Sequence, residues 1–450
     1  MDLLPSTDIR QLLAKAVDRQ APEAARGADQ LASVLGKDSS LIRSLTPEAQ
    51  QAGKAAASKK VMITYLSTGN GHRTAAEAVY CRLHELHPDW QVSKPIDMAN
   101  VSKVSKASTY VFEKAVKWGL WPKLFALADR FSGGTALAGL RRRFDLLGSG
   151  KFIDNVRAQN PDVIVHTNFI GSEIQAAARE SGRIPQNVEN VQVVTDMVGY
   201  GMYLGAHADL TLAPNLQVAE ELEQKGMEAR HIAITGIPIN PVFAQPADRA
   251  AARATLGFAP DAKVLLAQGN LIEDPSYFEH LMQQLAKAYP NGAQGKPIQV
   301  AVACGKDQPL YDQLQTLAKS YHGKVTLKPL GFLNPSQMRD VMSASDLTLT
   351  KPGGLTTSES VAMNLPMVLV DVLGGGQETR NAAFFAQHGA GVTAHNFDEA
   401  IGDTVSLLGQ PQRLNAMRQA AGRVAQPNAA TKVADVIAHL PAEPSQIGKS

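Results

Sequence analysis

The sequence predicts an α/β protein built from two doubly wound domains. Short apolar runs rich in β-branched residues alternate with helical patterns from residue 61 onward, as buried parallel strands and crossover helices do. The alternation pauses at GIPINPVF, residues 236–243, and over the alanine-rich stretch 244–257, and then resumes. A chain of 450 residues is long enough for two separate cores. We therefore expect two sheets joined near residue 240.

The expected strands divide the chain into its parts. They lie at residues 61–66, 163–167 and 191–195 in the first domain, and at 264–268, 299–303, 325–327, 347–350 and 367–370 in the second. The expected parts are a partly helical or disordered extension at 1–57, an N-terminal domain at 58–239, a C-terminal domain at 240–425 and a tail at 426–450. Ligands of such sheets bind beyond the carboxyl ends of the strands, so the loops there should hold the functional site.

The composition narrows the class of protein. The chain is 44% hydrophobic and 19% charged with a net charge of +2, which gives no general case for a nucleic-acid partner. Cys81 and Cys304 are too few for a disulfide framework and lack the neighbours of a zinc site. The first residues lack the apolar core of a secretory signal, and no stretch reaches the roughly 18 apolar residues of a spanning helix. We expect a cytoplasmic protein, soluble or resting on a membrane surface.

The loop after the first expected strand reads YLSTGNGHRTAAEAV, residues 65–79. Gly69 and Gly71 allow a tight turn and leave room for another molecule. His72 falls at the start of the next helix, where the helix dipole disfavours imidazolium and keeps the ring neutral, as a general base must be. The alternative is that the glycines only make the turn and His72 caps the helix. The third glycine of a dinucleotide fingerprint is missing.

A more specific pattern is TKPGGLTTSESVAMNLPMVLV, residues 350–370, a strand, loop, helix and strand. Gly353 and Gly354 leave backbone N–H groups free at a helix N-terminus, which suits a nucleotide diphosphate. Thr356 adds a hydroxyl donor. Glu359 lies about one turn into the helix, where its carboxylate can accept hydrogen bonds from two ribose hydroxyls. The alternative for Glu359 is a solvated helix residue.

The loop after the following strand, LGGGQETRNAAFF at residues 373–385, opens again with glycines. Gln377, Glu378 and Asn381 offer the mixed donors and acceptors that sugar hydroxyls require. In the alternative interpretation these polar side chains simply face water.

These motifs resemble a known family. The Ser67-x-Gly-x-Gly-His72 loop, residues 236–239, residues 351–354 and the Gln377-Glu378 pair followed by Asn381 are similar to processive diacylglycerol glycosyltransferases and monogalactosyldiacylglycerol synthases. These are inverting GT-B enzymes of the glycosyltransferase family 28 type, and the resemblance covers roughly residues 60–400. It implies a GT-B fold, in which two Rossmann-like domains face each other across a cleft.

The resemblance implies a role for each motif. A UDP-sugar would be held by the C-terminal domain, with Glu359 on the ribose, Gly353 and Gly354 on the diphosphate and Phe332 beside the uracil. His72 would be the base that takes the proton of the acceptor hydroxyl. The predicted catalytic residues are His72 and Asp196. The predicted donor-binding residues are Gly69, Gly71, Gly305, Phe332, Lys351, Gly353, Gly354, Thr356, Glu359, Gly376, Gln377, Glu378 and Asn381.

The implied chemistry is a direct displacement with inversion, which needs a base and an anchored leaving group but no covalent nucleophile. We expect no metal ion and no cofactor besides the UDP-sugar donor, with Lys351 supplying positive charge.

Three departures from the family pattern stand out. Asn70 replaces a glycine, Tyr200 and Tyr203 stand where a His and a Trp are usual, and the loop after residue 268 keeps only Gly269.

A basic, aromatic segment lies between residues 103 and 151. It contains Lys103, Lys106, Lys114, Lys117, Lys123 and Arg141–Arg143, together with Trp118, Trp121, Phe125 and Phe131. Tryptophans beside cationic residues are typical of a helix lying on an anionic membrane. The alternative is an ordinary helical hairpin with buried tryptophans, and no nucleic-acid motif accompanies the charges.

The leading hypothesis is transfer of a hexose, glucose or galactose, from a UDP-sugar to diacylglycerol or a glycosyldiacylglycerol at the membrane surface. One alternative is a UDP-sugar epimerase on the same fold, for which Asp196 and Glu378 would have to converge on the sugar. Others are a transferase with a non-glycerolipid acceptor, and a binding protein whose acceptor site has decayed.

Overall fold

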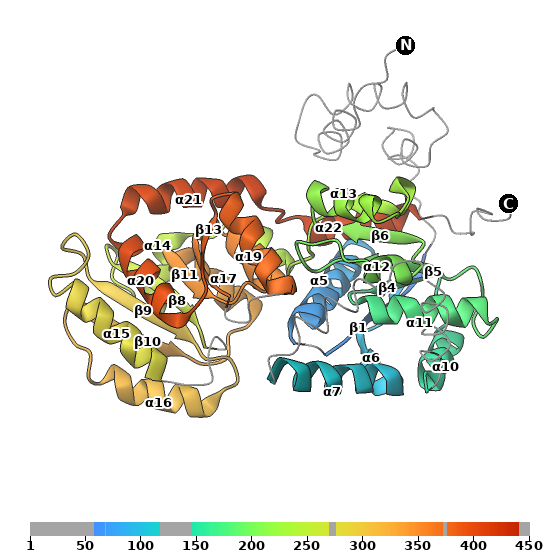
Figure 1. Ribbon diagram of the computed structural model, residues 1–450, viewed down its shortest axis with the longest axis horizontal. Coiled ribbons are helices and arrows are strands. Elements are labelled where there is room, and N and C mark those ends of the chain that lie inside the picture. The colour runs from blue at the N-terminus through green and yellow to red at the C-terminus, as the bar shows by residue number, and fades with distance from the viewer. Residues whose placement is uncertain are drawn as a thin grey trace, which may run out of the picture.

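The computed structural model describes residues 58–67, 69–117, 146, 148–269, 276–371 and 376–440. The expectations for the extension at 1–57 and for the aromatic residues from Trp118 to Phe131 lie outside the described residues. Figure 1 shows two lobes, each with a sheet and its helices, the blue and green segments in one and the yellow and orange segments in the other.

The first lobe holds a parallel seven-stranded sheet in the order β2-β1-β4-β5-β6-β7, with β3 also paired to β1. Its strands are β1 Lys60–Tyr65, β2 Gln91–Val92, β3 Ile96–Asp97, β4 Val163–His166, β5 Glu189–Val193, β6 Leu210–Ala213 and β7 Ile232–Ile234. Its helices are α5 Gly71–Leu86, α6 Met98–Val101, α7 Lys103–Lys117, α10 Gly150–Gln159, α11 Phe169–Glu180, α12 Met202–Gly205 and α13 Leu216–Gln224. The strand order reverses between β1 and β4, so a ligand site is expected beyond their carboxyl ends.

The second lobe holds a parallel six-stranded sheet in the order β10-β9-β8-β11-β12-β13. Its strands are β8 Lys263–Gln268, β9 Ile298–Ala303, β10 Val325–Leu330, β11 Leu347–Thr350, β12 Met367–Val370 and β13 Gly391–Ala394. Its helices are α14 Arg249–Leu256, α15 Ser276–Ala288, α16 Gln308–Ala318, α17 Pro335–Ala344, α18 Gly354–Ala362, α19 Gln377–Gln387, α20 Phe397–Leu408 and α21 Pro411–Val424. Here the order reverses between β8 and β11. The prediction of two parallel α/β sheets is confirmed.

The last helix corrects the expected tail at 426–450. Helix α22, Ala429–His439, returns to the first lobe and packs on α5, where Val433 and Ile437 are fully buried beside β1 and α5 side chains. The Lys59 Nζ donates hydrogen bonds to the carbonyl oxygens of Ile437 at 2.8 Å and Leu440 at 2.7 Å, which satisfies the carboxyl end of the helix. Figure 1 shows this red helix among the blue and green elements. The first core is therefore completed by the end of the chain.

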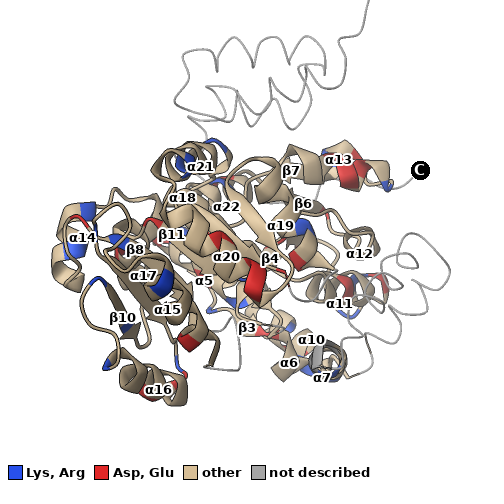
Figure 2. Ribbon diagram, turned by 60° about the vertical axis from the view of Figure 1, so that its left-hand side comes forward, with Lys and Arg blue, Asp and Glu red and all other residues tan. Residues whose placement is uncertain are grey.

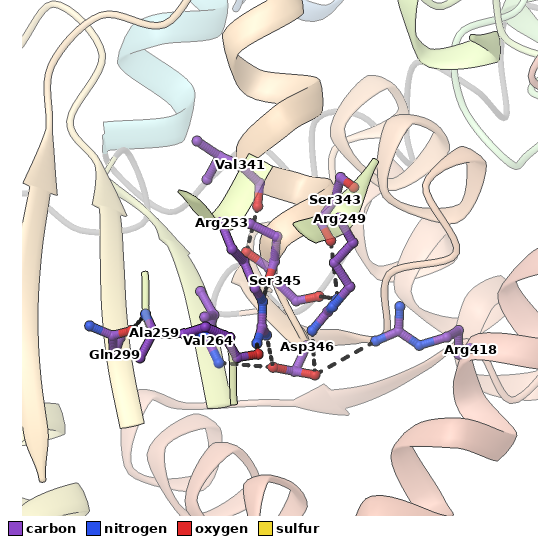
Figure 3. A network of polar contacts seen from close by, with 12 residues as sticks. Arg249, Arg253, Ala259, Val264, Gln299, Val341, Ser343, Ser345, Asp346 and Arg418 are labelled. Atoms are coloured by element: carbon purple, nitrogen blue, oxygen red, sulfur yellow. Dashed lines mark hydrogen bonds and ion pairs between the residues drawn. The ribbon is translucent and has the colours of Figure 1, made fainter. Parts of the chain in front are cut away.

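A cluster of arginines surrounds a carboxylate at the amino end of β11, on the edge of the second sheet opposite to the carboxyl ends of its strands. The Asp346 carboxylate, just before β11, lies 2.7 Å from Arg249 and 3.0 Å from Arg253, both on α14, and accepts the Val264 N–H at 2.9 Å. Arg418 of α21 approaches the same carboxylate at 4.0 Å (Figure 3). Because α14 and α21 adjoin the two connections between the lobes, this cluster fixes both connections to the sheet.

Candidate active site

The two switch points face each other across the seam between the lobes. Helix α5 follows β1 and helix α18 follows β11, and the first turns of the two helices are in contact. A Cβ on Gly71 would lie 3.5 Å from Leu355 Cδ2, and a Cβ on Gly354 would lie only 2.0 Å from the Thr195 carbonyl oxygen. Glycine at position 354 is therefore required by the close approach of the N-terminal lobe as well as by any ligand.

His72 lies in the first turn of α5, as predicted, and is held by the loops after β4 and β5. Its Nδ1 lies 2.6 Å from the Thr167 carbonyl oxygen, so we assign the ring proton to Nδ1, which donates to that oxygen. The Thr195 hydroxyl lies 3.1 Å from Nδ1, and the Asn168 amide donates to Nε2 at 3.3 Å. Burial lowers the pKa of His72 below its ordinary 6.5, although the nearby Asp196 carboxylate opposes the shift. The imidazole is thus neutral, with the lone pair on Nε2.

Asp196 belongs to the segment 195–199, which follows β5 and touches the second lobe. Its Oδ1 accepts a hydrogen bond from the Asn381 amide at 3.0 Å, and burial raises the pKa of its carboxyl. The same Asn381 amide donates to the Pro352 carbonyl at 3.0 Å, and its oxygen accepts the Met197 N–H at 2.6 Å. Both amide hydrogens of Asn381 are therefore used within the protein. The predicted sugar contact of Asn381 is restricted to the remaining lone pair of its oxygen.

Glu359 is the one acidic side chain of α18. It is half-buried, and no hydrogen bond or ion pair to it is found among the described residues. This burial raises the pKa of the Glu359 carboxyl to about 8. A buried carboxyl with free hydrogen-bonding capacity, one turn from a helix N-terminus, is suited to a ligand that donates hydrogen bonds, as the ribose prediction requires.

The amino end of α18 is bare, as expected for an anion site. Gly353 is its N-cap residue and supplies no side-chain cap, and Thr356 is half-buried in the first turn. The Lys351 side chain is also half-buried and acts on Glu378, lowering the pKa that burial raises. These N–H groups and this cation are available to a diphosphate.

Helix α19 starts at Gln377 with Gly376 as its N-cap residue at φ +79°, a conformation that favours glycine. Glu378 lies in the first turn, and its raised pKa reflects burial first and then the charges of Asp196 and Asp371. The structure thus brings Glu378 and Asp196 together from different lobes. Residues 372–375 of the glycine loop lie outside the described residues.

The remaining predicted donor residues occupy the rim of the second sheet. Phe332 is 62% exposed, with the Lys306 Nζ 5.4 Å from its ring centre, and Gly305 next to that lysine has φ +60°. Such an exposed ring beside a cation is available for stacking on a base. On the other side of the seam, Gly69 is exposed with φ +89° in the loop before α5. The Ser67 hydroxyl of that loop donates to Asp97 Oδ2 at 2.5 Å.

Sequence reasoning missed the side chains and carbonyls that hold the base, namely Thr167, Asn168 and Thr195. Thr167 and Asn168 follow β4, which lies next to β1, and Thr195 follows β5, which lies next to β4. Each reaches His72 only because the strands pair in this order. The single sequence signal was their position at the carboxyl ends of expected strands, where Thr167 and Thr195 are the last residues and Asn168 follows. Packing explains one of the two departures from the family pattern, Tyr203. Its side chain is 5% exposed, and its ring meets the Phe169 ring edge-on with the ring centres 6.2 Å apart.

Helix α7 is the described part of the basic segment. Tyr110 and Val111 are 60% and 55% exposed, and the Lys114 Nζ lies 5.6 Å from the Tyr110 ring centre. Elsewhere on the described elements, acidic and basic residues are interspersed (Figure 2). No helix within the described ranges is long and apolar enough to cross a membrane. Nor do the described residues contain a cluster of three or more His, Cys, Asp or Glu side chains that could hold a metal ion.

Family comparisons agree with this two-lobe division. Residues 72–239 match the family described as monogalactosyldiacylglycerol (MGDG) synthase, and residues 248–424 match the glycosyl transferases group 1. A processive diacylglycerol beta-glucosyltransferase of Bacillus subtilis is 27% identical over 80% of this chain and 90% of its own length. A probable monogalactosyldiacylglycerol synthase 2 of rice, Oryza sativa subsp. japonica, is 25% identical over 88% of this chain and 83% of its own length. The resemblance predicted from the motifs is confirmed.

Solved structures show the same fold. MurG of Acinetobacter baumannii superposes with a TM-score of 0.56 at 20% identity, covering 84% of this chain and 99% of its own. A putative UDP-N-acetylglucosamine 2-epimerase of Listeria monocytogenes superposes with a TM-score of 0.52 at 15% identity, covering 84% and 95%. With two parallel Rossmann-like sheets facing across a seam, the predicted GT-B fold is confirmed.

Proposed function

We propose that this relative of the diacylglycerol glucosyltransferases and MGDG synthases transfers a hexose, glucose or galactose, from a UDP-sugar to a lipid hydroxyl. The acceptor is diacylglycerol or a glycosyldiacylglycerol, which is what the names of the relatives indicate for those proteins. The observation that carries the proposal is the contact between α5 and α18 across the seam. Neutral His72 stands on α5, and Glu359, which has no hydrogen-bond or ion-pair partner among the described residues, stands on α18.

The base side of the reaction follows from the hydrogen bonds of His72. Because Nδ1–H donates to the Thr167 carbonyl, the basic lone pair is on Nε2; the acceptor hydroxyl would replace the 3.3 Å hydrogen bond from the Asn168 amide there and give up its proton as its oxygen attacks the anomeric carbon. The bond from that carbon to the diphosphate oxygen breaks, and UDP leaves with the bonding pair. The product is the glycoside with inverted configuration, and the imidazolium returns its proton to solvent. Asp196 lies close enough to stabilise the imidazolium by its charge.

The donor side depends on groups of the second lobe. The free N–H groups at the start of α18 and the Lys351 ammonium favour the negative charge that develops on the leaving diphosphate. Glu359 would accept hydrogen bonds from the ribose, and Gln377 and Glu378 at the start of α19 would bind the sugar. Phe332 offers its exposed face to the base. In this arrangement the chain's own residues supply the charge stabilisation, with no cofactor besides the donor.

The membrane part of the proposal rests on α7. Two large apolar side chains, Tyr110 and Val111, are exposed on a helix that also carries Lys103, Lys106 and Lys114. Exposed apolar residues accompanied by lysines favour an interface with anionic lipid. We propose that the protein works peripherally on such a membrane from the cytoplasmic side, where it meets its lipid acceptor.

Epimerisation of a UDP-sugar is the second candidate function. It is favoured by the convergence of Asp196, Glu378 and Asp371, whose charges act on one another in the seam. Against it, Asp196 is tied by the Asn381 amide, and the lipid-enzyme relatives cover 80% or more of the chain. We therefore keep it as an outcome of the test.

The test measures UDP release from UDP-glucose and UDP-galactose, with and without diacylglycerol in anionic vesicles. His72→Ala is compared with His280→Ala, a control on α15 that is far from the seam and 46% exposed. We expect lipid-dependent release that His72→Ala reduces at least a hundredfold, roughly the scale of a lost general base, and that His280→Ala leaves unchanged. UDP-sugar binding without lipid-dependent release from either donor would refute the lipid acceptor. Conversion of the sugar without UDP release would favour the epimerase.

A further inference from the structure

Helix α19 touches the N-terminal lobe at two places, and only one of them involves a predicted sugar-binding residue. Asn381 binds the segment 195–199 directly. The preceding residue, Arg380, extends to the other side and places Nη2 2.6 Å from Glu221 Oε1 on α13. This is an ion pair between the lobes. It lies outside the set of residues that contact the base or are predicted to contact the donor.

Glu221 also binds the segment 195–199, which carries Asp196. Its second oxygen, Oε2, accepts the Gly199 N–H at 2.9 Å, while Gln217 donates to Oε1 at 3.1 Å. Gly199 lies flush on α13, since a Cβ there would be 2.9 Å from the Val218 carbonyl oxygen. One carboxylate therefore joins the far end of the segment 195–199 to the C-terminal lobe.

Thr195, at the start of the segment 195–199, contacts the proposed base His72. The Thr195 hydroxyl lies 3.1 Å from His72 Nδ1, and its carbonyl oxygen abuts Gly354 at the start of α18. In the middle of the segment, the Met197 N–H donates to the Asn381 oxygen of α19 at 2.6 Å, and Met197 borders a cavity of about 30 Å³, room for about one water molecule. Helix α19 thus holds the segment directly through Asn381 and holds its far end through Arg380 and Glu221.

We propose that Arg380 and Glu221 are positioning residues of the transfer reaction, holding the segment 195–199 in the register in which Thr195 and Asp196 face His72. The same helix that holds the donor sugar at its first turn then fixes the acceptor-side loop through its second turn. The alignment of the base is thereby tied to the helix that is proposed to bind the donor sugar. This inference rests on the proposed transferase function, but its structural part can be tested without it.

The test uses Glu221→Gln and Arg380→Gln, which remove the ion pair while the amide oxygen introduced at position 221 keeps an acceptor for the Gly199 N–H. The matched control is Arg230→Gln, which breaks the Arg230–Glu228 pair, 2.9 Å long and also in the N-terminal lobe but remote from the seam. For each protein we would measure kcat and KM for lipid-dependent transfer, the Kd for UDP, and hydrogen exchange of the amides of residues 197–199.

We expect each single variant to lower kcat about two- to fivefold, the effect of a partly exposed ion pair, with Kd for UDP changed less than about twofold. The amides of Met197 and Gly199 should exchange at least threefold faster. The double variant should be no more than about twofold worse than either single variant, because the two residues act as one contact. Arg230→Gln should alter neither kcat nor exchange.

Losses that multiply in the double variant, unchanged exchange at 197–199, or equal losses in Arg230→Gln would overturn the proposal. A wild-type protein without lipid-dependent transfer would refute the proposed function instead. In that case faster exchange in both single variants, measured with UDP bound, still supports the coupling of α19 to the segment, and unchanged exchange refutes it.

Discussion

If Glu359 binds the ribose as proposed, its raised pKa predicts that donor binding releases a proton. With a pKa of about 8, the free protein carries a protonated Glu359 in about nine molecules of ten at pH 7. A ribose presents two hydroxyl donors, and the carboxylate accepts both, whereas the protonated form accepts less well. Binding should therefore favour the ionised form and release about 0.9 proton at pH 7. Below pH 7 the Kd should rise up to about tenfold per pH unit, and above about pH 8 it should level off.

Calorimetry in buffers of different ionisation enthalpy measures this proton directly. The ligands are UDP-glucose and UDP-galactose without lipid, since their diphosphate does not titrate near neutral pH. Glu359→Gln should release almost no proton and should bind about 10- to 100-fold more weakly, the loss of hydrogen bonds to a charged acceptor. Glu399→Gln is the control, because Glu399 is exposed on α20 and bonds the His395 N–H at 2.8 Å. Equal proton release by the wild type and Glu359→Gln would refute the ribose role.

Three further predictions follow from the structure. Measured as kcat at saturating UDP-sugar, where donor binding no longer depends on pH, the acid limb should lie below pH 6.5, because the base must be neutral and burial lowers the pKa of His72 from that value; a limb at or above 6.5 contradicts this assignment. Asp346→Ala should lower the free energy of unfolding, measured in urea, by about 3–5 kcal/mol, because Arg249 and Arg253 lose their counter-charge. A loss below about 1 kcal/mol would show that water solvates these arginines instead. Gly354→Ala should abolish transfer with little change in the melting temperature, since its Cβ would lie 2.0 Å from a carbonyl oxygen across the seam; retained activity would mean that the seam is open in solution.

Much of the fold was predictable from local sequence. The eight expected strands all fall within or overlap observed ones, because parallel strands buried on both faces leave continuous β-branched runs. Strands β2, β3, β6, β7 and β13, of two to four residues each, were not predicted. Helix α22 was taken for part of a tail, although Val433 and Ile437 repeat at helical spacing. The destination of an amphipathic helix is not encoded in its own pattern, and here its partner, β1, lies at the other end of the chain.

The candidate site, like the fold, was predictable only in part. The glycine loops and the helices that begin after them were predictable, because strand, glycine and helix are consecutive in the chain. The groups that hold His72 were not, because Thr167 and Thr195 become its neighbours only through pairing of β1 with β4 and of β4 with β5. The same holds for Arg380 and Glu221, which are 159 positions apart. Contacts of this kind depend on the docking of the two lobes.

The arrangement of two helix starts at one seam has a consequence for the reaction. The first turns of α5 and α18 touch, and in the proposed reaction their positive ends stabilise the departing diphosphate but oppose a proton on His72. A base in this field holds its proton only if a negative charge compensates it. Asp196 provides that charge, since its carboxylate favours the imidazolium. In the proposed reaction the position of Asp196, fixed by the hydrogen bond from Asn381 of α19, would therefore determine whether His72 can accept the proton as UDP departs.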